Sequence, residues 1–120
     1  MPIKLGLSEK RKNYLEEKLK ELLPRLYRLN PEKVILFGSF ARGDVHKGSD
    51  LDLIIIKKDV PEKFLKRLDF AYEALEPDFP LDLLVYTPEE IEKMKEVNPF
   101  IKKALKEGII LYERGSEESF

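Results

Sequence analysis

Two aspartates stand where a buried strand would be expected to carry apolar side chains. Asp50 and Asp52 flank Leu51 at the start of the otherwise apolar run Leu51–Ile56. Residues i and i+2 of a strand point to the same face, so the two carboxylates would lie a few ångströms apart. Burying them without a counter-charge would be unfavourable. A divalent cation would neutralise both, and oxygen ligands alone favour Mg²⁺ or Mn²⁺ over zinc.

A third carboxylate interrupts the next apolar run. Asp82 lies within Leu81–Tyr86. If the two strands are neighbours, we expect all three carboxylates to converge and to hold one or two Mg²⁺ ions together with phosphate oxygens. Asp78 is a rival for the third position, but it lies in the turn between two prolines, so Asp82 is favoured.

A glycine and a serine follow the first apolar run, Val34–Phe37. Gly38 would let backbone N–H groups approach a phosphate closely, and the Ser39 hydroxyl could donate to a phosphate oxygen. Arg42 could neutralise phosphate charge, or form an ion pair with Asp44 or with a carboxylate of the site. We expect the nearby Asp44 and His46 to be solvated loop residues.

The elements that must position these residues follow from periodicity. Ser8 is a good helix N-cap, and leucines recur after it at helical spacing. Pro24 is expected to kink or break that helix. Pro61 suits the first turn of a second helix, and Thr87-Pro88-Glu89-Glu90 forms a capping box for a third. The leucine stripe comprises Leu15, Leu19, Leu22, Leu23, Leu26 and Leu29, and the second helix presents Phe64, Leu65, Leu68, Ala71, Tyr72 and Leu75 to the core.

The rest of the chain completes the pattern. Asn98-Pro99 begins another helix, which ends at Gly108, and Ile109–Tyr112 reads as a last strand. The order αβαβαβααβ predicts a single α/β domain over residues 1–112. Residues 113–120 are expected to form a flexible tail.

Composition excludes several classes of protein. The 120 residues include 22 basic and 23 acidic ones, for a net charge of −1, and no cysteine. Disulfides and thiolate metal sites are therefore excluded, and a broad electrostatic grip on nucleic acid is not expected. The chain has no apolar run of ~20 residues that could cross a bilayer and no signal peptide. We expect a cytoplasmic protein without membrane contact.

The motif residues resemble a known family. Gly38-Ser39, ten further residues and then Asp50-Leu51-Asp52 is similar to the signature of the polymerase-β-like nucleotidyltransferases. Ala41-Arg42-Gly43 and Ser49 also resemble the form found in minimal nucleotidyltransferase (MNT) proteins, the antitoxins that pair with HEPN toxins. The resemblance implies the polymerase-β-like fold, a small mixed sheet flanked by helices.

The resemblance also implies roles. Asp50 and Asp52 would bind two metal ions, and Asp82 would bind one and help to deprotonate the acceptor hydroxyl. Gly38 and Ser39 would hold the β- and γ-phosphates of ATP, with Arg42 and Ser49 also at the nucleotide. Larger relatives carry a further domain that helps to bind the base or the acceptor, and this chain has no room for one, so a partner would supply the acceptor.

The leading hypothesis is thus transfer of AMP from ATP to a tyrosine of a HEPN-type toxin. One alternative is a small-molecule nucleotidyltransferase of the aminoglycoside-modifying kind, and another is an antitoxin that acts by binding alone. A polymerase or a tRNA-tailing enzyme is disfavoured by the near-neutral charge. A homodimer or a hetero-oligomer with the partner is expected.

Overall fold

The computed structural model describes residues 7–115. Within this range the elements follow the predicted order. They are α1 (Leu7–Arg28), β1 (Lys33–Phe37), α2 (Gly38–Arg42), β2 (Leu51–Ile56), α3 (Phe64–Leu75), β3 (Leu81–Tyr86), α4 (Pro88–Val97), α5 (Pro99–Glu107) and β4 (Ile109–Glu113). The last strand reaches one residue beyond its predicted end, and of the predicted tail, residues 116–120 lie outside the described residues.

The strands form one mixed sheet in the order β3-β2-β1-β4. Strand β1 pairs antiparallel with both β2 and β4, whereas β2 and β3 run parallel. A parallel pair needs a crossover, and α3 provides it. The prediction of a single domain with a small mixed sheet flanked by helices is confirmed.

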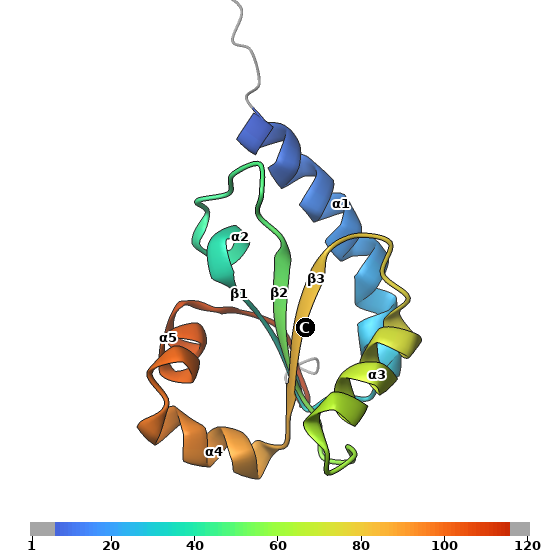
Figure 1. Cartoon of the computed structure of the whole chain (residues 1–120), viewed down its shortest axis with the longest axis vertical. Helices are drawn as coiled ribbons and strands as arrows, with labels where there is room; N and C mark the ends of the chain where they lie inside the picture. Colours follow the sequence, from blue (N-terminus) through green and yellow to red (C-terminus); the bar gives the residue numbers. More distant parts are fainter. Residues whose placement is uncertain (1–6, 116–120) are drawn as a thin grey trace, which may run out of the picture.

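Helices cover both faces of the sheet (Figure 1). Helices α1 and α3 lie on one side, where the leucines of α1 join the inward side chains of β2 and β3 in the larger apolar core. Helices α4 and α5 lie on the other side, over a smaller core that includes Ile54 and Ile101. Because strand side chains alternate, Asp52 and Asp82 belong to the face that carries α4 and α5.

Helix α1 runs through Pro24 without a break, so the predicted break is wrong. Leu22 and Leu26 on either side of the proline are 1% and 0% exposed. Their packing on the core keeps the segment helical although the proline removes one backbone hydrogen bond.

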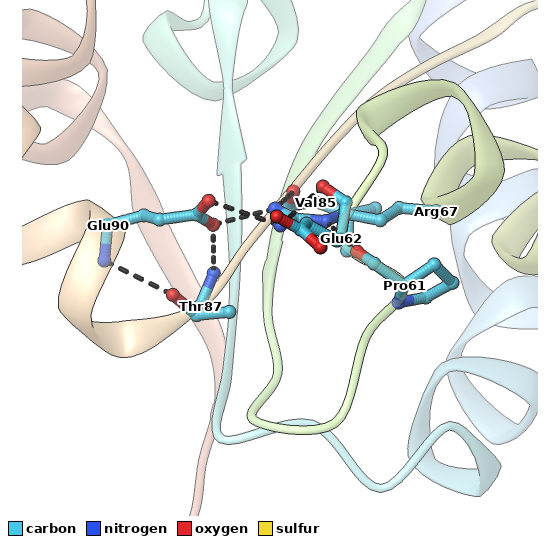
Figure 2. A network of polar contacts seen from close by, with 6 residues as sticks. All are labelled: Pro61, Glu62, Arg67, Val85, Thr87 and Glu90. Atoms are coloured by element: carbon cyan, nitrogen blue, oxygen red, sulfur yellow. Dashed lines mark hydrogen bonds and ion pairs between the residues drawn. The ribbon is translucent and has the colours of Figure 1, made fainter.

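Helix α3 buries an arginine that sequence reasoning did not single out. Arg67 is 6% exposed and occupies a position in line with buried Ala71 and Leu75. Its guanidinium donates to the backbone carbonyls of Pro61, Glu62 and Val85 and to both carboxylate oxygens of Glu90. Figure 2 shows this network, which links α3 to β3 and to the start of α4. All five N–H donors of the buried guanidinium therefore have an acceptor.

Two expectations for α3 are corrected by the structure. Pro61 lies before α3, not in its first turn, because the backbone at Lys63 is still extended and the helix begins only at Phe64. Leu65, expected in the core, is 73% exposed because the buried face of α3 follows Arg67, Ala71 and Leu75.

The predicted capping box of α4 is confirmed. The Thr87 hydroxyl accepts from the Glu90 backbone N–H, and the Glu90 carboxylate accepts from the Thr87 N–H (Figure 2). Glu90 therefore both caps α4 and pairs with Arg67. Among the helices within residues 7–115, none is long and apolar enough to cross a membrane.

Candidate active site

The carboxylates of Asp52 and Asp82 are brought together by the parallel strand pair. Asp52 on β2 is the register partner of Asp82 on β3, with Leu51 opposite Leu81 and Leu53 opposite Leu83. Paired residues of neighbouring strands share a face, so the two side chains lie side by side on the sheet. Asp52 is half-buried and Asp82 is exposed at the edge strand.

The environment of Asp52 favours its neutral form. Burial is the largest cause that raises the pKa of Asp52, to about 7, followed by its hydrogen bond with Asp82 and by the negative charges of Asp82 and Asp50. The positive charge of Arg42 acts in the opposite direction. Two carboxylates can share a hydrogen bond only if one holds a proton, so the site accepts a positive charge readily.

Gly38 is required by the close approach of the turn to this pair. Its φ of +82° is a conformation that glycine adopts readily. A Cβ added at this position would lie 2.2 Å from Asp52 Oδ2. The turn that follows β1 is therefore pressed directly against the carboxylate.

Asp50 does not join the other two carboxylates. Its Oδ1 accepts from the Arg11 guanidinium at 3.2 Å, and Arg11 Nε also donates to the Ser49 carbonyl at 2.7 Å. Within residues 7–115, no three carboxylate or imidazole groups are close enough together to hold a metal ion. The expected convergence of three carboxylates is thus corrected to a pair, because an arginine of α1 holds the third.

Ser49 organises the loop between α2 and β2. Its side chain is buried, and its Oγ accepts from Ser39 Oγ at 2.8 Å and from the His46 backbone N–H at 2.9 Å. His46 is exposed as expected, and its Nδ1 also accepts from the Gly48 N–H. Ser39 and Ser49 are thus brought together, with Ser49 beneath the loop and Ser39 at the cleft described below.

The remaining candidate residues form ion pairs in two separate parts of the structure. Arg42 Nε pairs with Asp44 at 3.4 Å, and Arg42 Nη1 lies 3.8 Å from Glu107 on α5. Asp44 is an exposed loop residue, as expected. Asp78 pairs with Lys18 at 3.0 Å on another part of the surface. Asp82, not Asp78, therefore stands beside Asp52.

A cleft of about 720 Å³ opens over the carboxylate pair. Gly38, Ser39, Arg42, Asp52 and Asp82 all line it, whereas Asp50 and Ser49 do not. The other lining residues were not among the candidate site residues predicted from the sequence. These are Phe37, Leu68, Tyr72, Leu83, Leu84, Phe100, Lys103, Ala104 and Glu107.

The two walls of the cleft differ in character. On the α3 side, Tyr72 donates its hydroxyl to the Leu81 carbonyl, and burial is the first cause that raises the Tyr72 pKa, followed by the charge of Asp82. On the α5 side, the ring of Phe100 packs edge-to-face on Phe37 at 5.7 Å. Among the lining residues, the cations are Lys103 of α5 and Arg42 of α2, and none comes from α3.

The carboxylate pair fits a divalent cation. Its donors are all oxygens, it carries excess negative charge, and neither Asp52 nor Asp82 forms an ion pair with a residue in the described range 7–115. Hard oxygen donors are the ligands that Mg²⁺ and Mn²⁺ prefer. Asp50 could add a third donor only by leaving Arg11.

Comparison with known proteins identifies a family and relatives that share the sequence of this domain. Residues 13–112 match the nucleotidyltransferase domain family. Two proteins of Methanocaldococcus jannaschii named "Putative protein adenylyltransferase" are 32% identical over 89 residues and 33% identical over 100 residues. These matches cover 68% and 81% of this chain, and 58% and 97% of the relatives.

A solved structure shares the fold. The crystal structure of a "putative nucleotidyltransferase" from Sulfolobus solfataricus superimposes with a TM-score of 0.65 and 22% sequence identity, and the match covers 92% of this chain and 91% of that chain. The family match spans most of the sequence and includes both the glycine-serine turn and the carboxylate pair. The chain therefore belongs to the nucleotidyltransferase domain family.

Proposed function

We propose that this protein transfers AMP from ATP to a hydroxyl group of a partner protein, with a tyrosine of a HEPN-type toxin as the acceptor. The observation that carries the proposal is the Asp52–Asp82 pair in a cleft that also holds Gly38 and Ser39. A carboxylate pair that forms no ion pair with residues 7–115, with one member half-buried, and a turn suited to phosphate are the two halves of a nucleotidyl-transfer site.

In this proposal each residue has a distinct task. Asp52 and Asp82 hold Mg²⁺ or Mn²⁺, and Asp50 joins them when it leaves Arg11. A divalent cation bound there neutralises phosphate charge and acidifies a coordinated hydroxyl. Ser39 turns its hydroxyl proton from Ser49 Oγ to the β- or γ-phosphate, and Gly38 keeps the backbone close enough for that contact.

In the proposed reaction Asp82 accepts the proton of the acceptor hydroxyl. Its side chain is exposed on β3, an edge strand, so the acceptor side of the cleft is open to a large molecule. Attack of the hydroxyl oxygen on the α-phosphorus forms the new P–O bond as the bond to pyrophosphate breaks. The open edge and the names of the M. jannaschii relatives support a protein acceptor.

The test uses radiolabelled ATP and Mg²⁺ with lysate of the source cells. We expect label from the α-phosphate, and none from the γ-phosphate, on a single protein band that mass spectrometry identifies. Asp52→Asn should abolish the label, whereas Asp59→Asn, which removes an exposed acid away from the cleft, should not.

The other outcomes separate the alternatives. Label found only on a small molecule would show that the acceptor is not a protein. It would favour a small-molecule nucleotidyltransferase of the aminoglycoside-modifying kind. Full neutralisation of the toxin by Asp52→Asn would indicate an antitoxin that acts by binding alone. Equal labelling from both phosphate positions would indicate phosphorylation and overturn AMP transfer.

A further inference from the structure

The α5 wall of the cleft carries a lysine that the proposed mechanism does not yet use. Lys103 is an exposed residue of α5 that lines the cleft together with Phe100 and Glu107 of the same helix. Its neighbours Lys102 and Lys106 are also exposed but do not line the cleft. One of three lysines on α5 therefore faces the site.

The position of α5 places this lysine near the glycine-serine turn. Phe100 packs its ring on Phe37, the residue before Gly38. Glu107, one turn after Lys103, lies 3.8 Å from Arg42 at the end of α2. Lys103 lies between these two contacts along α5, so it belongs to the side of the cleft that carries Ser39, opposite the Tyr72 side.

The two cations that line the cleft, Arg42 and Lys103, differ in their ion pairs. Arg42 is shared between the carboxylates of Asp44 and Glu107. Lys103 makes no ion pair with any residue between 7 and 115, although it borders a cleft with three carboxylates. A lysine ammonium binds phosphate as a mobile point charge that needs no fixed geometry.

We infer that Lys103 binds the pyrophosphate end of the nucleoside triphosphate, the β- and γ-phosphates that leave in the reaction. This inference rests on the proposed nucleotidyl transfer and adds a specificity residue to it. The α5 side then selects the triphosphate, and the Tyr72 side is left to the acceptor. Lys103 stabilises the departing pyrophosphate by charge alone and exchanges no proton with it.

The test compares two nucleotides that differ only in the phosphates concerned. Binding of AMP and of the ATP analogue with a methylene group between the α- and β-phosphorus is measured by calorimetry in Mg²⁺. We expect Lys103→Gln to weaken binding of the analogue by about tenfold and to leave AMP binding unchanged. Lys103→Arg should restore most of the lost affinity.

Lys102→Gln is the matched control because it removes the same charge from the adjacent position of α5. It should change neither affinity, and both variants should unfold at the temperature of the unmodified protein because both side chains are exposed. Equal weakening of AMP and analogue, or equal effects of the two glutamine variants, would overturn the assignment of Lys103 to the pyrophosphate end.

Failure of the inference and failure of the proposed function give different results. If the unmodified protein binds the analogue and Lys103→Gln binds it as well, only the inference fails. If the unmodified protein binds neither nucleotide, the proposed function fails and the inference falls with it.

Discussion

Arg67 and the Asp52–Asp82 pair both adjoin strand β3, and they differ in how their charges are compensated. Arg67 donates to three backbone carbonyls and to a carboxylate that lies 2.6 Å away at its nearest. Asp52 is paired with another carboxylate, and burial followed by its hydrogen bond with Asp82 raises its pKa. The first cluster is complete within the described residues, and under the proposed function a divalent cation would complete the second.

This difference separates stability from activity. A buried charge with every partner in place fixes neighbouring segments relative to one another, and removing it leaves those partners unpaired. A carboxylate pair held close by the strand ladder destabilises the metal-free chain but is prepared for a ligand. Substitutions in the two clusters should therefore have opposite effects on folding.

The largest effect is expected on catalysis. Asp52→Asn or Asp82→Asn should lower the rate of AMP transfer by about 10³-fold or more, because each removes a negative oxygen from the proposed metal site. Steady-state labelling with Mg²⁺ and ATP measures this. A rate within tenfold of the unmodified protein would show that the pair is not the reacting centre.

The next effect is expected on folding. Arg67→Met should lower the free energy of unfolding by about 3–4 kcal/mol, because the carbonyls of Pro61, Glu62 and Val85 lose their donor and Glu90 loses its counter-charge. Urea denaturation followed by circular dichroism measures it. Arg28→Met, at an exposed arginine near the end of α1, is the control and should change stability by less than about 0.5 kcal/mol.

A smaller effect of opposite sign is expected from Asp52→Asn in metal-free buffer. Because the folded-state pKa of Asp52 is raised from 3.8 to about 7, ionisation costs the folded state stability as pH rises between these values, and the cost persists above 7. Allowing for solvent screening of a half-buried group, the variant should gain about 1–2 kcal/mol at pH 8.

The gain should vanish below about pH 3, where Asp52 is protonated in both the folded and the unfolded state. Urea unfolding with EDTA at pH 8 and pH 3 measures both values. Excess Mg²⁺ should reverse the order at pH 8 by stabilising only the unmodified protein. A variant less stable than the unmodified protein at pH 8 without metal would contradict the proposed repulsion.

The smallest effect concerns the exposed end of the arginine network. Arg67 is the first cause that lowers the Glu90 pKa below its ordinary 4.5. The ion pair therefore contributes stability above that value, and the contribution is lost as pH falls through the lowered pKa. Glu90→Gln keeps the capping box and removes the charge.

We expect this variant to lose about 0.5–1 kcal/mol at pH 7, because the Glu90 side chain is 40% exposed and screened. The difference from the unmodified protein should shrink as the pH is lowered from 5 toward 2. A difference that is constant over this range would mean that the lost stability comes from packing or capping and not from the ion pair.

The elements and the carboxylate pair followed from local patterns in the sequence. Four apolar runs bounded by turn residues predicted the four strands, and Asp52 and Asp82 stood out because a charge within such a run has no structural use. The sequence alone does not show that β2 pairs with β3. The register of this pair, which places the two aspartates opposite each other, is a property of the folded sheet.

The residues that were missed take their roles from contacts between distant segments. Arg67 follows the helical period of Ala71 and Leu75, which is a signal of burial, but its acceptors at Pro61 and Val85 come together only in the folded chain. The spacing of Asp50 and Asp52 predicts a shared metal site, but it does not reveal that Arg11, 39 positions away, pairs with Asp50. A charged residue in the sequence does not show which residue of opposite charge will pair with it in the folded chain.

The ladder register between β2 and β3 also determines how the site can change in evolution. The separation of Asp52 and Asp82 is set by the distance between neighbouring strands and not by the loops that lead into them. Loops before and after either strand can lengthen without moving the two carboxylates apart. A single residue inserted within β2 or β3 would turn one aspartate to the opposite face. Changes of loop length around the site should therefore preserve the carboxylate pair. An insertion within β2 or β3 should abolish the pair, as loss of one aspartate would.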